Sequence, residues 1–523
     1  MALFVERIMP IFLTMWGGDY SHPLIYPLLL VCLLVPTILF LKAKGGARRL
    51  RLPPGPPGLP ILGHLHLLGS APHKSLGDLS KRYGPLIYLR YGSTPAVVAS
   101  SPAIAKLILQ IHDQSFACRP QPIVVKHLYG FRDMLFCQPG PYWKLMRQLC
   151  ATDLFATKRL RAFAPMIAEE VCAMLSAIAD LGPHKLVPVR ATIYSANANI
   201  IARMAIGKRL HEVAPRSQAD PSHNLSLLIV EIIQLFGMFN VGDYFPWLAF
   251  LDLQGYGRQS KALSLKLQRV WQEVIDARRL QHQINSGVSQ QVDLLDVLLS
   301  VAESNDDISD FDIKAILSDM FAGGIDTSTI AIEWALMELL RHPLIMRRMQ
   351  EELESVVGSS RLVCESDVQQ MPYLRAVVKE TMRVHPVAPI LLHMTSQQCQ
   401  LCDFDIPSNT HVYVNIWAIG RDPTIWDRPL EFRPERFLDC DVDVRGQHFE
   451  LLPFGSGRRG CPGLTLGLGN VHIMLANLIQ VFDWNIENAP NLSEKFGIVL
   501  TLEKPLVAKA SLKVSRHLLN KHV

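Results

Sequence analysis

The chain has 523 residues, of which 49% are hydrophobic and 19% are charged, and its formal net charge at pH 7 is +5. Such a chain can bury a large core, which excludes the weakly hydrophobic and highly charged composition of disordered proteins. Part of the small basic excess lies in one cluster, Lys42, Lys44, Arg48, Arg49 and Arg51. Because a nucleic-acid-binding domain carries a basic stripe on its folded part, the sequence does not indicate a nucleic-acid partner.

The first predicted element is a membrane anchor at residues 24–41, which are nearly all apolar and carry no charge. Their number only just meets the ~17–25 residues that a membrane-spanning helix needs. More positive charge follows this segment than precedes it, so residues 1–23 are predicted to be lumenal and the body cytosolic. Residues 42–58 are basic and then rich in proline, which lacks an amide donor and fixes φ. They predict a stiff hinge between anchor and body.

Residues 59–523 contain no internal repeat and no second linker, and they predict one large, mainly helical domain. Residues near 85–99 and 406–414 have the β-branched and aromatic character of short strands. A 3.6-residue hydrophobic period predicts long helices at residues 311–341, 344–357, 373–384 and 464–482. The first of these helices would extend about 45 Å at ~1.5 Å per residue, long enough to cross the domain.

The ten cysteines are scattered through the chain, in a pattern that does not suit a disulfide scaffold. Most of them are therefore expected to be reduced and buried. Cys399 and Cys402 have CxxC spacing. No second pair and no paired histidines follow at zinc-ribbon distance, which disfavours a zinc site.

A glycine-rich loop at residues 453–463 invites two incompatible interpretations. Gly455, Gly457 and Gly460 spell GxGxxG before a helical pattern, as in a dinucleotide-binding fold. That interpretation needs a strand before the loop and a βαβ unit around it. Residues 439–446 are charged and irregular, so a nicotinamide dehydrogenase is disfavoured.

The second interpretation of the loop depends on Cys461, which precedes a predicted helix and follows two arginines. Helix N-termini and nearby cations both favour a thiolate over a thiol. Glycines let a backbone lie close under a flat macrocycle and direct amides at the sulfur. The usual fate of a lone cysteine is burial as a small apolar side chain, but the spacing of the loop favours a haem ligand.

Phe454, Gly457, Arg459, Cys461 and Gly463 match every fixed position of the cytochrome P450 haem-binding signature, so the chain resembles this family. Further elements agree in order and spacing, namely residues 323–327, Glu380 with Arg383, and residues 434–437. The resemblance runs from about residue 53 to about residue 506. It implies a mainly α-helical fold with small β-sheets around a buried haem b. Cys461 would be the axial ligand of the haem iron, with Phe454 and Arg459 beside the cofactor.

The resemblance also assigns a structural network. Glu380 and Arg383 are three apart on a predicted helix, so they share one face and can form an ion pair. Taken alone, this is a common surface pair. In the family the two residues join a later arginine, here Arg436, in a buried network behind the haem.

Asp326 and Thr327 follow a glycine pair inside the longest predicted helix, where each glycine costs roughly 0.5–1 kcal/mol against alanine. In the family the helix bulges at this point to make room for dioxygen, and the acid and the alcohol carry protons to it. We therefore expect Asp326 and Thr327 to be catalytic. Without Cys461, an ordinary mid-helix pair would be the favoured interpretation.

Trp143 and Arg147 are four apart on a predicted helix after Gly140 and Pro141, so they point the same way. In resembling proteins they contact the haem propionates, whereas a surface tryptophan–arginine stack is the alternative. His393 stands where relatives usually carry an arginine that binds a propionate. That contact stays open, because a histidine is not always charged at cytosolic pH.

Residues 443–449 resemble the plant flavonoid-oxidising branch, which includes flavone synthase II, flavanone 2-hydroxylases and isoflavone synthases. Residues 83–86 and 417–423 resemble plant microsomal members more widely. The chain is therefore expected in the endoplasmic reticulum membrane, with O2 and electrons from NADPH-cytochrome P450 reductase. Its expected substrate is a small hydrophobic plant metabolite, such as a flavonoid that undergoes flavanone 2-hydroxylation or flavone formation.

Other functions stay open at this point. The substrate of a monooxygenase could instead be another phenylpropanoid or a terpenoid. A haem-thiolate isomerase or dehydratase would need no reductase, but Asp326 and Thr327 count against it, and a non-catalytic haem-binding protein or sensor is a further alternative. By resemblance, the pocket walls are expected from residues 116–134, 320–323, 387–392 and 498–500.

Overall fold

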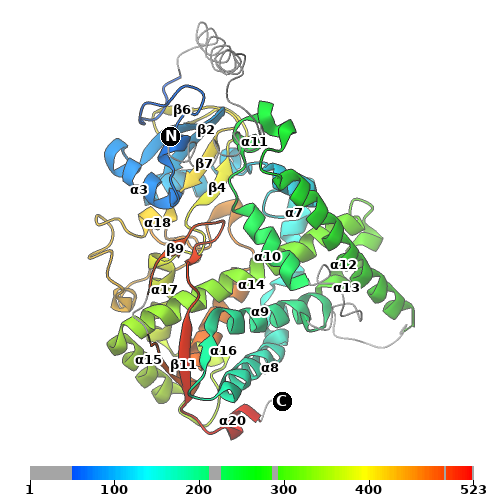
Figure 1. Cartoon of the computed structure of the whole chain (residues 1–523), viewed down its shortest axis with the longest axis vertical. Coiled ribbons are helices and arrows are strands. Elements are labelled where there is room, and N and C mark those ends of the chain that lie inside the picture. Colours follow the sequence, from blue (N-terminus) through cyan, green and yellow to red (C-terminus); the bar gives the residue numbers. More distant parts are fainter. Residues whose placement is uncertain (1–49, 211–224, 285–292, 488–490, 521–523) are drawn as a thin grey trace, which may run out of the picture.

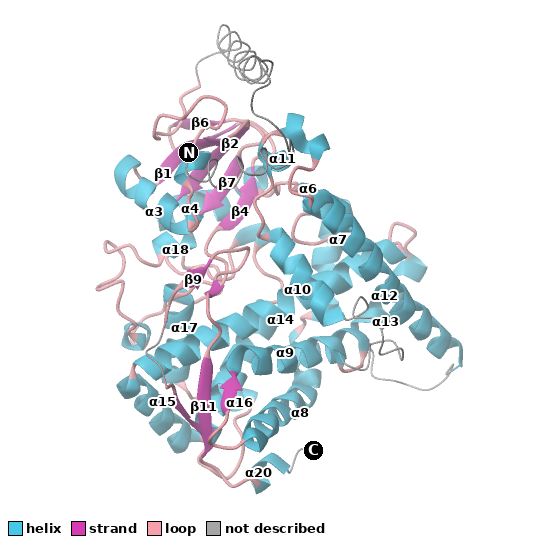
Figure 2. Cartoon of the chain, in the orientation of Figure 1, coloured by secondary structure: helices cyan, strands magenta, loops and turns pink. Residues whose placement is uncertain are grey.

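The computed structural model describes residues 50–210, 225–284, 293–487 and 491–520. A four-stranded sheet lies at one end of the molecule beside helices α3 (Pro72–Tyr83) and α18 (Ile416–Ile419), and helices form most of the remainder (Figure 1). Colouring by secondary structure makes the same division visible (Figure 2). This architecture confirms the prediction of a mainly α-helical fold with small β-sheets.

The other helices are α4 (Pro102–Lys106), α5 (Asp113–Phe116), α6 (Ile123–Tyr129), α7 (Pro141–Leu149), α8 (Thr157–Leu181), α9 (Val189–Ile206), α10 (Leu225–Phe236), α11 (Val241–Tyr244), α12 (Tyr256–Ile284), α13 (Leu294–Ser304), α14 (Asp310–Arg341), α15 (Pro343–Val356), α16 (Glu365–Val368), α17 (Pro372–Val384), α19 (Leu464–Val481) and α20 (His517–Asn520). Short 3-10 or π turns are η2 (Leu65–Leu67), η3 (Leu107–Ile111), η4 (Cys150–Leu154), η7 (Pro246–Leu251), η8 (Pro434–Phe437) and η9 (Gly457–Arg459). The strands are β1 (Leu86–Tyr91), β2 (Thr94–Ala99), β3 (Leu186–Pro188), β4 (Leu391–Met394), β5 (Cys399–Leu401), β6 (Phe404–Ile406), β7 (His411–Val414), β8 (Phe482–Asn485), β9 (Glu494–Lys495), β10 (Thr501–Leu502) and β11 (Val507–Leu512).

The main sheet has the strand order β1-β2-β7-β4. β1 and β2 form an antiparallel hairpin, β7 runs parallel to β2, and β4 runs antiparallel to β7. The strand region predicted at residues 85–99 is this hairpin. The region predicted at 406–414 is divided between the end of β6 and β7, because Pro407 lacks an amide donor and Asn409 adopts a positive φ of 54°.

Helix α14 runs through the middle of the helical body, between α9 and α10 (Figure 1). It begins at a capping box formed by Ser309 and Asp312, and it ends before His342, whose position ahead of Pro343 disfavours helical φ and ψ. The four long helices predicted from hydrophobic period correspond to α14, α15, α17 and α19, each within one residue of the expected bounds.

Three helical segments among the described residues are long and apolar enough to cross a membrane, Thr157–Leu181, Leu225–Tyr244 and Leu464–Val481. All three are partly buried in the body, and for α19 the buried share of the apolar window is 67%. Their apolar faces therefore contribute to the core. The predicted lumenal segment 1–23, the anchor 24–41 and the hinge up to residue 49 lie outside the described residues.

The described end of the predicted hinge is attached to the sheet. The Arg51 amide donates to the Asp405 carboxylate at 2.9 Å, and the Arg51 carbonyl accepts from the Asp405 amide at 2.7 Å. The Tyr88 amide donates to the Pro54 carbonyl at 2.9 Å. A Cβ on Gly55 would lie 2.2 Å from the Tyr88 carbonyl oxygen, so the two backbones touch. Because β1 is an edge strand, this proline-rich segment covers backbone groups that would otherwise be open to another chain.

We expect a chain that begins at Leu59 to unfold at a lower temperature than a chain that begins at Leu50. The shorter chain loses the hydrogen bonds of Arg51 and Pro54, each worth ~0.5–1.5 kcal/mol, and uncovers the edge of β1. Circular dichroism melting curves of the two chains measure the difference. Equal midpoints would contradict a stabilising role for residues 50–58.

Candidate functional site

The loop from Phe454 to Gly463 is closed by its own backbone. The Cys461 amide donates to the Phe454 carbonyl at 2.8 Å, and the Gly460 amide donates to the Gly457 carbonyl at 3.1 Å. Phe454 packs against the main hydrophobic core, and Gly463 is the N-cap of α19. The position of Cys461 is therefore fixed relative to both the core and the first turn of α19.

Two glycines are required by the path of this loop. Gly455 and Gly457 have φ of +67° and +66°, in a region that residues with side chains rarely adopt. A Cβ on Gly457 would also lie 1.8 Å from the Leu109 carbonyl oxygen, so the loop touches η3. Residues 438–463 are all described and contain no strand. The βαβ unit that the dinucleotide interpretation needs is therefore missing from this place.

The Cys461 sulfur borders an open space inside the body. The side chain is accessible, yet burial raises the pKa of the thiol because protein surrounds the sulfur at longer range. The Gly463 amide donates to the sulfur, and the Arg147 guanidinium lies near it, so both lower the pKa of the thiol. The N-terminus of α19 adds a partial positive charge. These three groups favour a thiolate at Cys461 and offset in part the effect of burial, which is larger and favours the thiol.

The Arg459 guanidinium donates to three backbone carbonyls of a facing segment, those of Ala117 (2.7 Å), Met134 (3.3 Å) and Cys137. It also lies over the Trp143 ring, 4.6 Å from the ring centroid. Burial lowers the pKa of Arg459 to about 10. Trp143 is buried, and its Nε1 has no hydrogen-bond partner in the described part of the chain. Two donors, one of them charged, therefore lie side by side in the interior.

Helix α7 brings both of its predicted site residues to the cysteine loop. Arg147 lies one turn after Trp143, and its Nη1 donates to the Gly460 carbonyl at 2.7 Å. The carbonyl belongs to the residue directly before Cys461. Arg147 thus connects α7 to the loop and places a positive charge near the sulfur.

Arg119 is a buried cation of this site that the sequence analysis missed. Its Nε has no hydrogen-bond partner among the described residues, and burial lowers the pKa of its guanidinium to about 9. The backbone of Arg119 is fixed by the Gln138 side chain, which bonds its amide at 3.2 Å and its carbonyl at 2.8 Å. Asp133 raises this pKa only in part, so a free buried donor on a cation indicates a place for a further anion. The available signal was that Arg119 is the only charged residue between Asp113 and Lys126.

His393 lies on β4, close to both arginines. Its Nδ1 is 2.9 Å from the Phe116 carbonyl oxygen. Burial lowers the pKa of His393 well below its usual value, and Arg119 and Arg459 lower it further. The imidazole is therefore neutral, with its proton on Nδ1 for the carbonyl. A neutral Nε2 accepts a hydrogen bond and cannot donate one to an anion.

The two glycines of α14 have different surroundings. A Cβ on Gly324 would lie 2.6 Å from Cδ1 of Ile201, so Gly324 lets α9 pack closely. Nothing lies within 4 Å of a Cβ at Gly323, which is accessible although it lies in the central helix. The Thr327 hydroxyl, one turn later, donates to the Gly323 carbonyl at 2.7 Å. Helix α14 is α-helical throughout, and it is the missing side chain of Gly323 that leaves open space beside Thr327.

Asp326 belongs to a charged group between α14 and α9. Burial raises the pKa of Asp326, whereas Arg190 of α9 lowers it. Arg190 also forms an ion pair with the buried Glu333 at 2.7 Å. Burial raises the pKa of Tyr194, and the charge of Asp326 raises it further, so this phenol lies near the carboxylate. An acid whose pKa is raised toward neutrality is suited to proton exchange.

Glu380, Arg383 and Arg436 form one connected network. Arg383 binds both carboxylate oxygens of Glu380, at 2.7 Å and 2.8 Å, and Arg436 Nε binds Oε1 at 3.0 Å. The Arg433 amide donates to the same oxygen at 2.8 Å. Both Glu380 and Arg383 are fully buried. Removal of one partner from such a network typically costs ~3–5 kcal/mol, because an uncompensated charge stays buried.

Backbone hydrogen bonds join two pairs of the segments that are expected to form the pocket walls. The Leu500 amide donates to the Val387 carbonyl at 2.7 Å, which joins residues 498–500 to residues 387–392. The Met394 amide donates to the Cys118 carbonyl at 2.8 Å, which joins β4 to the start of the segment 116–134.

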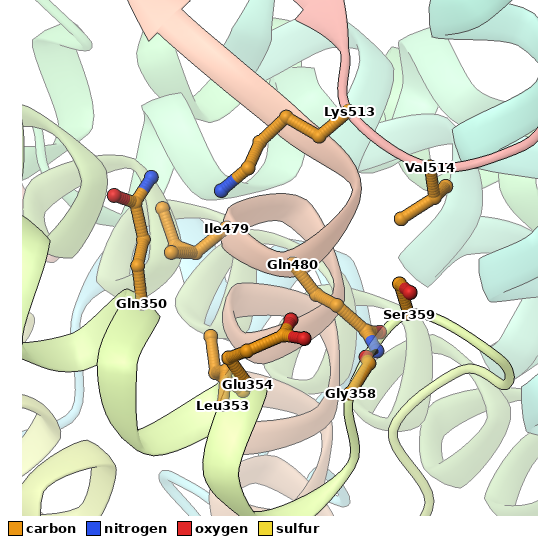
Figure 3. A pocket seen from close by; sticks show the side chains of 9 residues that line it. All are labelled: Gln350, Leu353, Glu354, Gly358, Ser359, Ile479, Gln480, Lys513 and Val514. Carbon is orange, nitrogen blue, oxygen red and sulfur yellow. Dashed lines mark hydrogen bonds between the residues drawn. The ribbon is translucent and has the colours of Figure 1, made fainter.

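A small separate cavity of about 70 Å³ lies between α15, α19 and the residues after β11. Figure 3 shows Glu354, Gln480 and Lys513 among its lining side chains. None of the predicted site residues lines this cavity, so it is distinct from the site beside Cys461.

Comparisons with known proteins identify the family of the chain. Residues 53–510 match the family model described as Cytochrome P450. Cytochrome P450 93A3 of Glycine max is 38% identical over 500 residues, which cover 92% of this chain and 97% of that protein. A flavonoid 3'-monooxygenase of Crocosmia x crocosmiiflora is 40% identical over 478 residues, which cover 88% of this chain and 92% of that protein.

Solved structures agree as well. A zebrafish cytochrome P450 with progesterone has a TM-score of 0.70 and 27% sequence identity, with 84% of this chain and 99% of that chain covered. The match of family model, relatives and fold extends over nearly the whole described body. The chain therefore belongs to the cytochrome P450 family of monooxygenases, which bind haem b.

Proposed function

We propose that the chain is a haem-thiolate monooxygenase in which Cys461 is the axial ligand of the haem iron. The observation that carries the proposal is the sulfur environment, where a glycine amide, an arginine and the N-terminus of α19 act against the effect of burial and favour a thiolate at an exposed sulfur. A thiolate is a soft, charged donor that suits iron.

The polar residues around the open space fit a haem with two propionates. Trp143 Nε1 and Arg119 Nε are buried donors without partners among the described residues, and a carboxylate would satisfy both. Arg459 and Arg147 add positive charge on the same side. We infer that these four side chains hold the propionates, and that Phe454 packs against the macrocycle. His393, being neutral, adds no third positive charge beside Arg119 and Arg459 and does not act as a donor itself.

Haem bound through a thiolate supplies the chemistry that cleaves the O–O bond and oxidises the substrate. The chain contributes the protons. Thr327 donates its own proton to the Gly323 carbonyl, so its oxygen remains free to accept from a water molecule in the open space. Asp326, whose pKa is raised by burial, exchanges protons with groups on the α9 side. We infer that Thr327 holds this water and that Asp326 resupplies its proton.

The substrate class that is best supported is a flavonoid. Two relatives at 38–40% identity are named flavonoid 3'-monooxygenase and flavonoid 3',5'-hydroxylase, and a third is named 3,9-dihydroxypterocarpan 6A-monooxygenase. Within the class, flavanone 2-hydroxylation or flavone formation is the proposed reaction. The apolar residues among the pocket walls, such as Val387 and Leu500, suit a flat aromatic ligand, and they would also accept another phenylpropanoid or a terpenoid.

Asp326 and Thr327 favour a monooxygenase over the functions that need no reductase. A haem-thiolate isomerase or dehydratase, or a haem sensor, has no use for a proton path beside the open face of α14. Electrons must come from outside the chain, since the described residues contain no dinucleotide fold at the GxGxxG loop. NADPH-cytochrome P450 reductase is the proposed donor.

We further propose that residues 24–41 anchor the chain in the endoplasmic reticulum membrane, with the body in the cytosol. The described body has its own exposed apolar side chains in η7, with Trp247 56%, Phe250 82% and Leu251 48% accessible, and these suit contact with lipid. Removal of residues 1–49 should therefore weaken membrane association without abolishing it. Carbonate-washed membranes measure this, and full retention of the shortened chain would contradict the anchor.

The substitution Cys461→Ser should abolish the red-shifted Soret band of the reduced, carbon monoxide-bound protein, and with it turnover. A neutral hydroxyl is a poor replacement for a charged soft donor. Cys150→Ser is the matched control, because Cys150 is a second buried thiol near Cys461. A normal carbon monoxide spectrum in Cys461→Ser would refute the proposed ligand.

The substitution Thr327→Ala should keep the carbon monoxide spectrum but divert electrons from product to hydrogen peroxide. Positioned proton transfer is worth typically ~10²–10⁴-fold in rate, and alanine removes the hydroxyl that holds the water. The measurement compares NADPH consumed, peroxide formed and product formed with the flavanone naringenin. Thr327→Ser, which keeps the hydroxyl, is the control.

Two results would count against separate parts of this proposal. Unchanged coupling in Thr327→Ala on a substrate that is turned over would remove Thr327 from the proton path. Failure of the unsubstituted enzyme to oxidise any flavanone would refute the substrate class. It would not affect the haem-thiolate assignment, which the carbon monoxide spectrum of Cys461→Ser tests separately.

A further inference from the structure

The hairpin of β9 and β10 carries residues 498–500, which are expected to form part of the pocket wall. Each strand is only two residues long, with Glu494–Lys495 paired to Thr501–Leu502. A two-stranded hairpin of this size has little stability of its own. Its position must therefore come from contacts with the rest of the chain, and Figure 1 shows it between the sheet end and the helical body.

The leg of the hairpin after the turn is held through the backbone of Leu500. Its amide donates to the Val387 carbonyl at 2.7 Å, and its carbonyl accepts from Nε1 of Trp334 at 3.1 Å. Trp334 is fully buried in α14, and its ring stacks on the His385 ring with 3.9 Å between the centroids. These bonds do not depend on the side chain of residue 500.

The leg before the turn is held by side chains of α3 instead. One carboxylate oxygen of Glu494 lies 2.5 Å from Nζ of Lys74 and 3.4 Å from Nε2 of His73. Burial alone would raise the pKa of Glu494, but hydrogen bonds from His73 and Lys74 and the charge of Arg421 lower it to about 2. Glu494 is therefore ionised at neutral pH.

His73 packs against the same leg. Its side chain is completely buried, and its ring stacks on Phe496 with 5.4 Å between the centroids and an interplanar angle of 12°. The edge of the His73 ring meets Trp417 of α18 at 5.0 Å, and the His73 carbonyl accepts from the Asn415 side chain at 2.8 Å. His73 is thus fixed on two sides, so it can hold Phe496, the residue directly before the turn.

The turn between the legs has few attachments of its own. Residues 497–499 make no hydrogen bond to another element in the described part of the chain. Gly237, which follows α10, comes close to them, because a Cβ at this position would lie 2.9 Å from the Ile498 nitrogen. The place of Ile498 and Val499 therefore depends on how firmly the two legs are held.

The ion pair of Glu494 and Lys74 differs from an ordinary surface pair. The Lys74 side chain is 46% exposed, whereas that of Glu494 is only 8% exposed. An exposed pair contributes little, but a carboxylate that loses its partner inside the protein is left as an uncompensated charge. The pair therefore favours the attached position of the hairpin over a detached one.

We propose that Glu494 is a positioning residue that fixes the β9–β10 turn as a wall of the substrate pocket, through its ion pair with Lys74 and its contact with His73. It acts through Ile498 and Val499 and does not touch the reacting atoms. That this wall faces a flavonoid rests on the proposed function, whereas the attachment of the hairpin does not. When the pair is broken, a ligand that needs the wall binds more weakly in proportion to the time for which the turn is out of place.

The test uses the full-length, haem-loaded protein. The variants Glu494→Gln and Lys74→Met each break the pair, a double variant carries both changes, and Lys74→Arg keeps the positive charge. Glu487→Gln is the matched control, because it breaks a 2.7 Å ion pair with Lys509 that does not involve the β9–β10 hairpin.

Three quantities are measured for each protein. The shift of the Soret band gives the dissociation constants of ketoconazole and imidazole, which both bind haem iron through a nitrogen but differ in size, so that only ketoconazole reaches the pocket walls. Hydrogen exchange is followed in peptides from residues 491–502. KM and kcat are determined for naringenin.

Glu494→Gln and Lys74→Met should raise the dissociation constant of ketoconazole by about tenfold, if the turn keeps its place for a tenth of the time, and leave that of imidazole unchanged. Exchange in residues 491–502 should become faster. KM for naringenin should rise with little change in kcat, since a wall binds the substrate and the transition state alike. Lys74→Arg and Glu487→Gln should behave as the unsubstituted protein does.

The double variant should show an effect no larger than that of one single variant, because both changes break the same pair. Effects that multiply in the double variant would overturn the pair. An unchanged ratio of the two azole dissociation constants in Glu494→Gln, or an equal rise of this ratio in Glu487→Gln, would overturn the positioning role. If Glu494→Gln fails to hold haem, Lys74→Met decides, since its half-exposed side chain lies outside the core.

The proposed function and this inference fail in different ways. If the unsubstituted protein does not oxidise naringenin or any other flavonoid, the proposed substrate class is refuted. The azole dissociation constants and the exchange of residues 491–502 then decide the role of Glu494 by themselves, because neither measurement needs turnover.

Discussion

The site beside Cys461 depends on two buried positive charges. Arg119 and Arg459 lie near one another, and burial lowers the pKa of both. A lowered arginine pKa means that the protein alone does not compensate the charge. The backbone carbonyls around Arg459 satisfy its hydrogen bonds but carry no net charge. Asp133 compensates this charge in part, and in the proposed function the two carboxylates of haem supply the rest.

The burial of Arg459 explains why segments far apart in the sequence meet beside the cysteine loop. Arg459 from the cysteine loop binds carbonyls near residues 117, 134 and 137, and the first of these is bridged to β4. The arginine thus cross-links the sheet end of the molecule to the helical body. A guanidinium with five donors in a rigid fork suits this role, since it can bond several carbonyls while it faces an anion.

The sequence was sufficient to predict the features that depend on residues close together in the chain. The four long helices, the β1–β2 hairpin and the glycine requirement of the Cys461 loop follow from hydrophobic period, β-branched composition and motif spacing. The surroundings of single residues depend on tertiary contacts instead. Gly323 and Gly324 are equivalent in the sequence, and only the approach of Ile201 distinguishes the open glycine from the packed one. Likewise, the docking of Arg51 on Asp405 joins residues 354 positions apart.

Arg119 and His393 illustrate the limit most clearly, because the sequence analysis judged His393 by its own position and missed Arg119. The sequence analysis looked for a positive charge at residue 393, where the structure has a neutral imidazole. The buried positive charge near this position belongs to Arg119. The two positions are electrostatically linked, since Arg119 lowers the pKa of His393. An arginine at position 393 would put a third buried cation beside Arg119 and Arg459, and the repulsion among the three would add to the free-energy cost of their burial. The neutral imidazole of His393 avoids this repulsion.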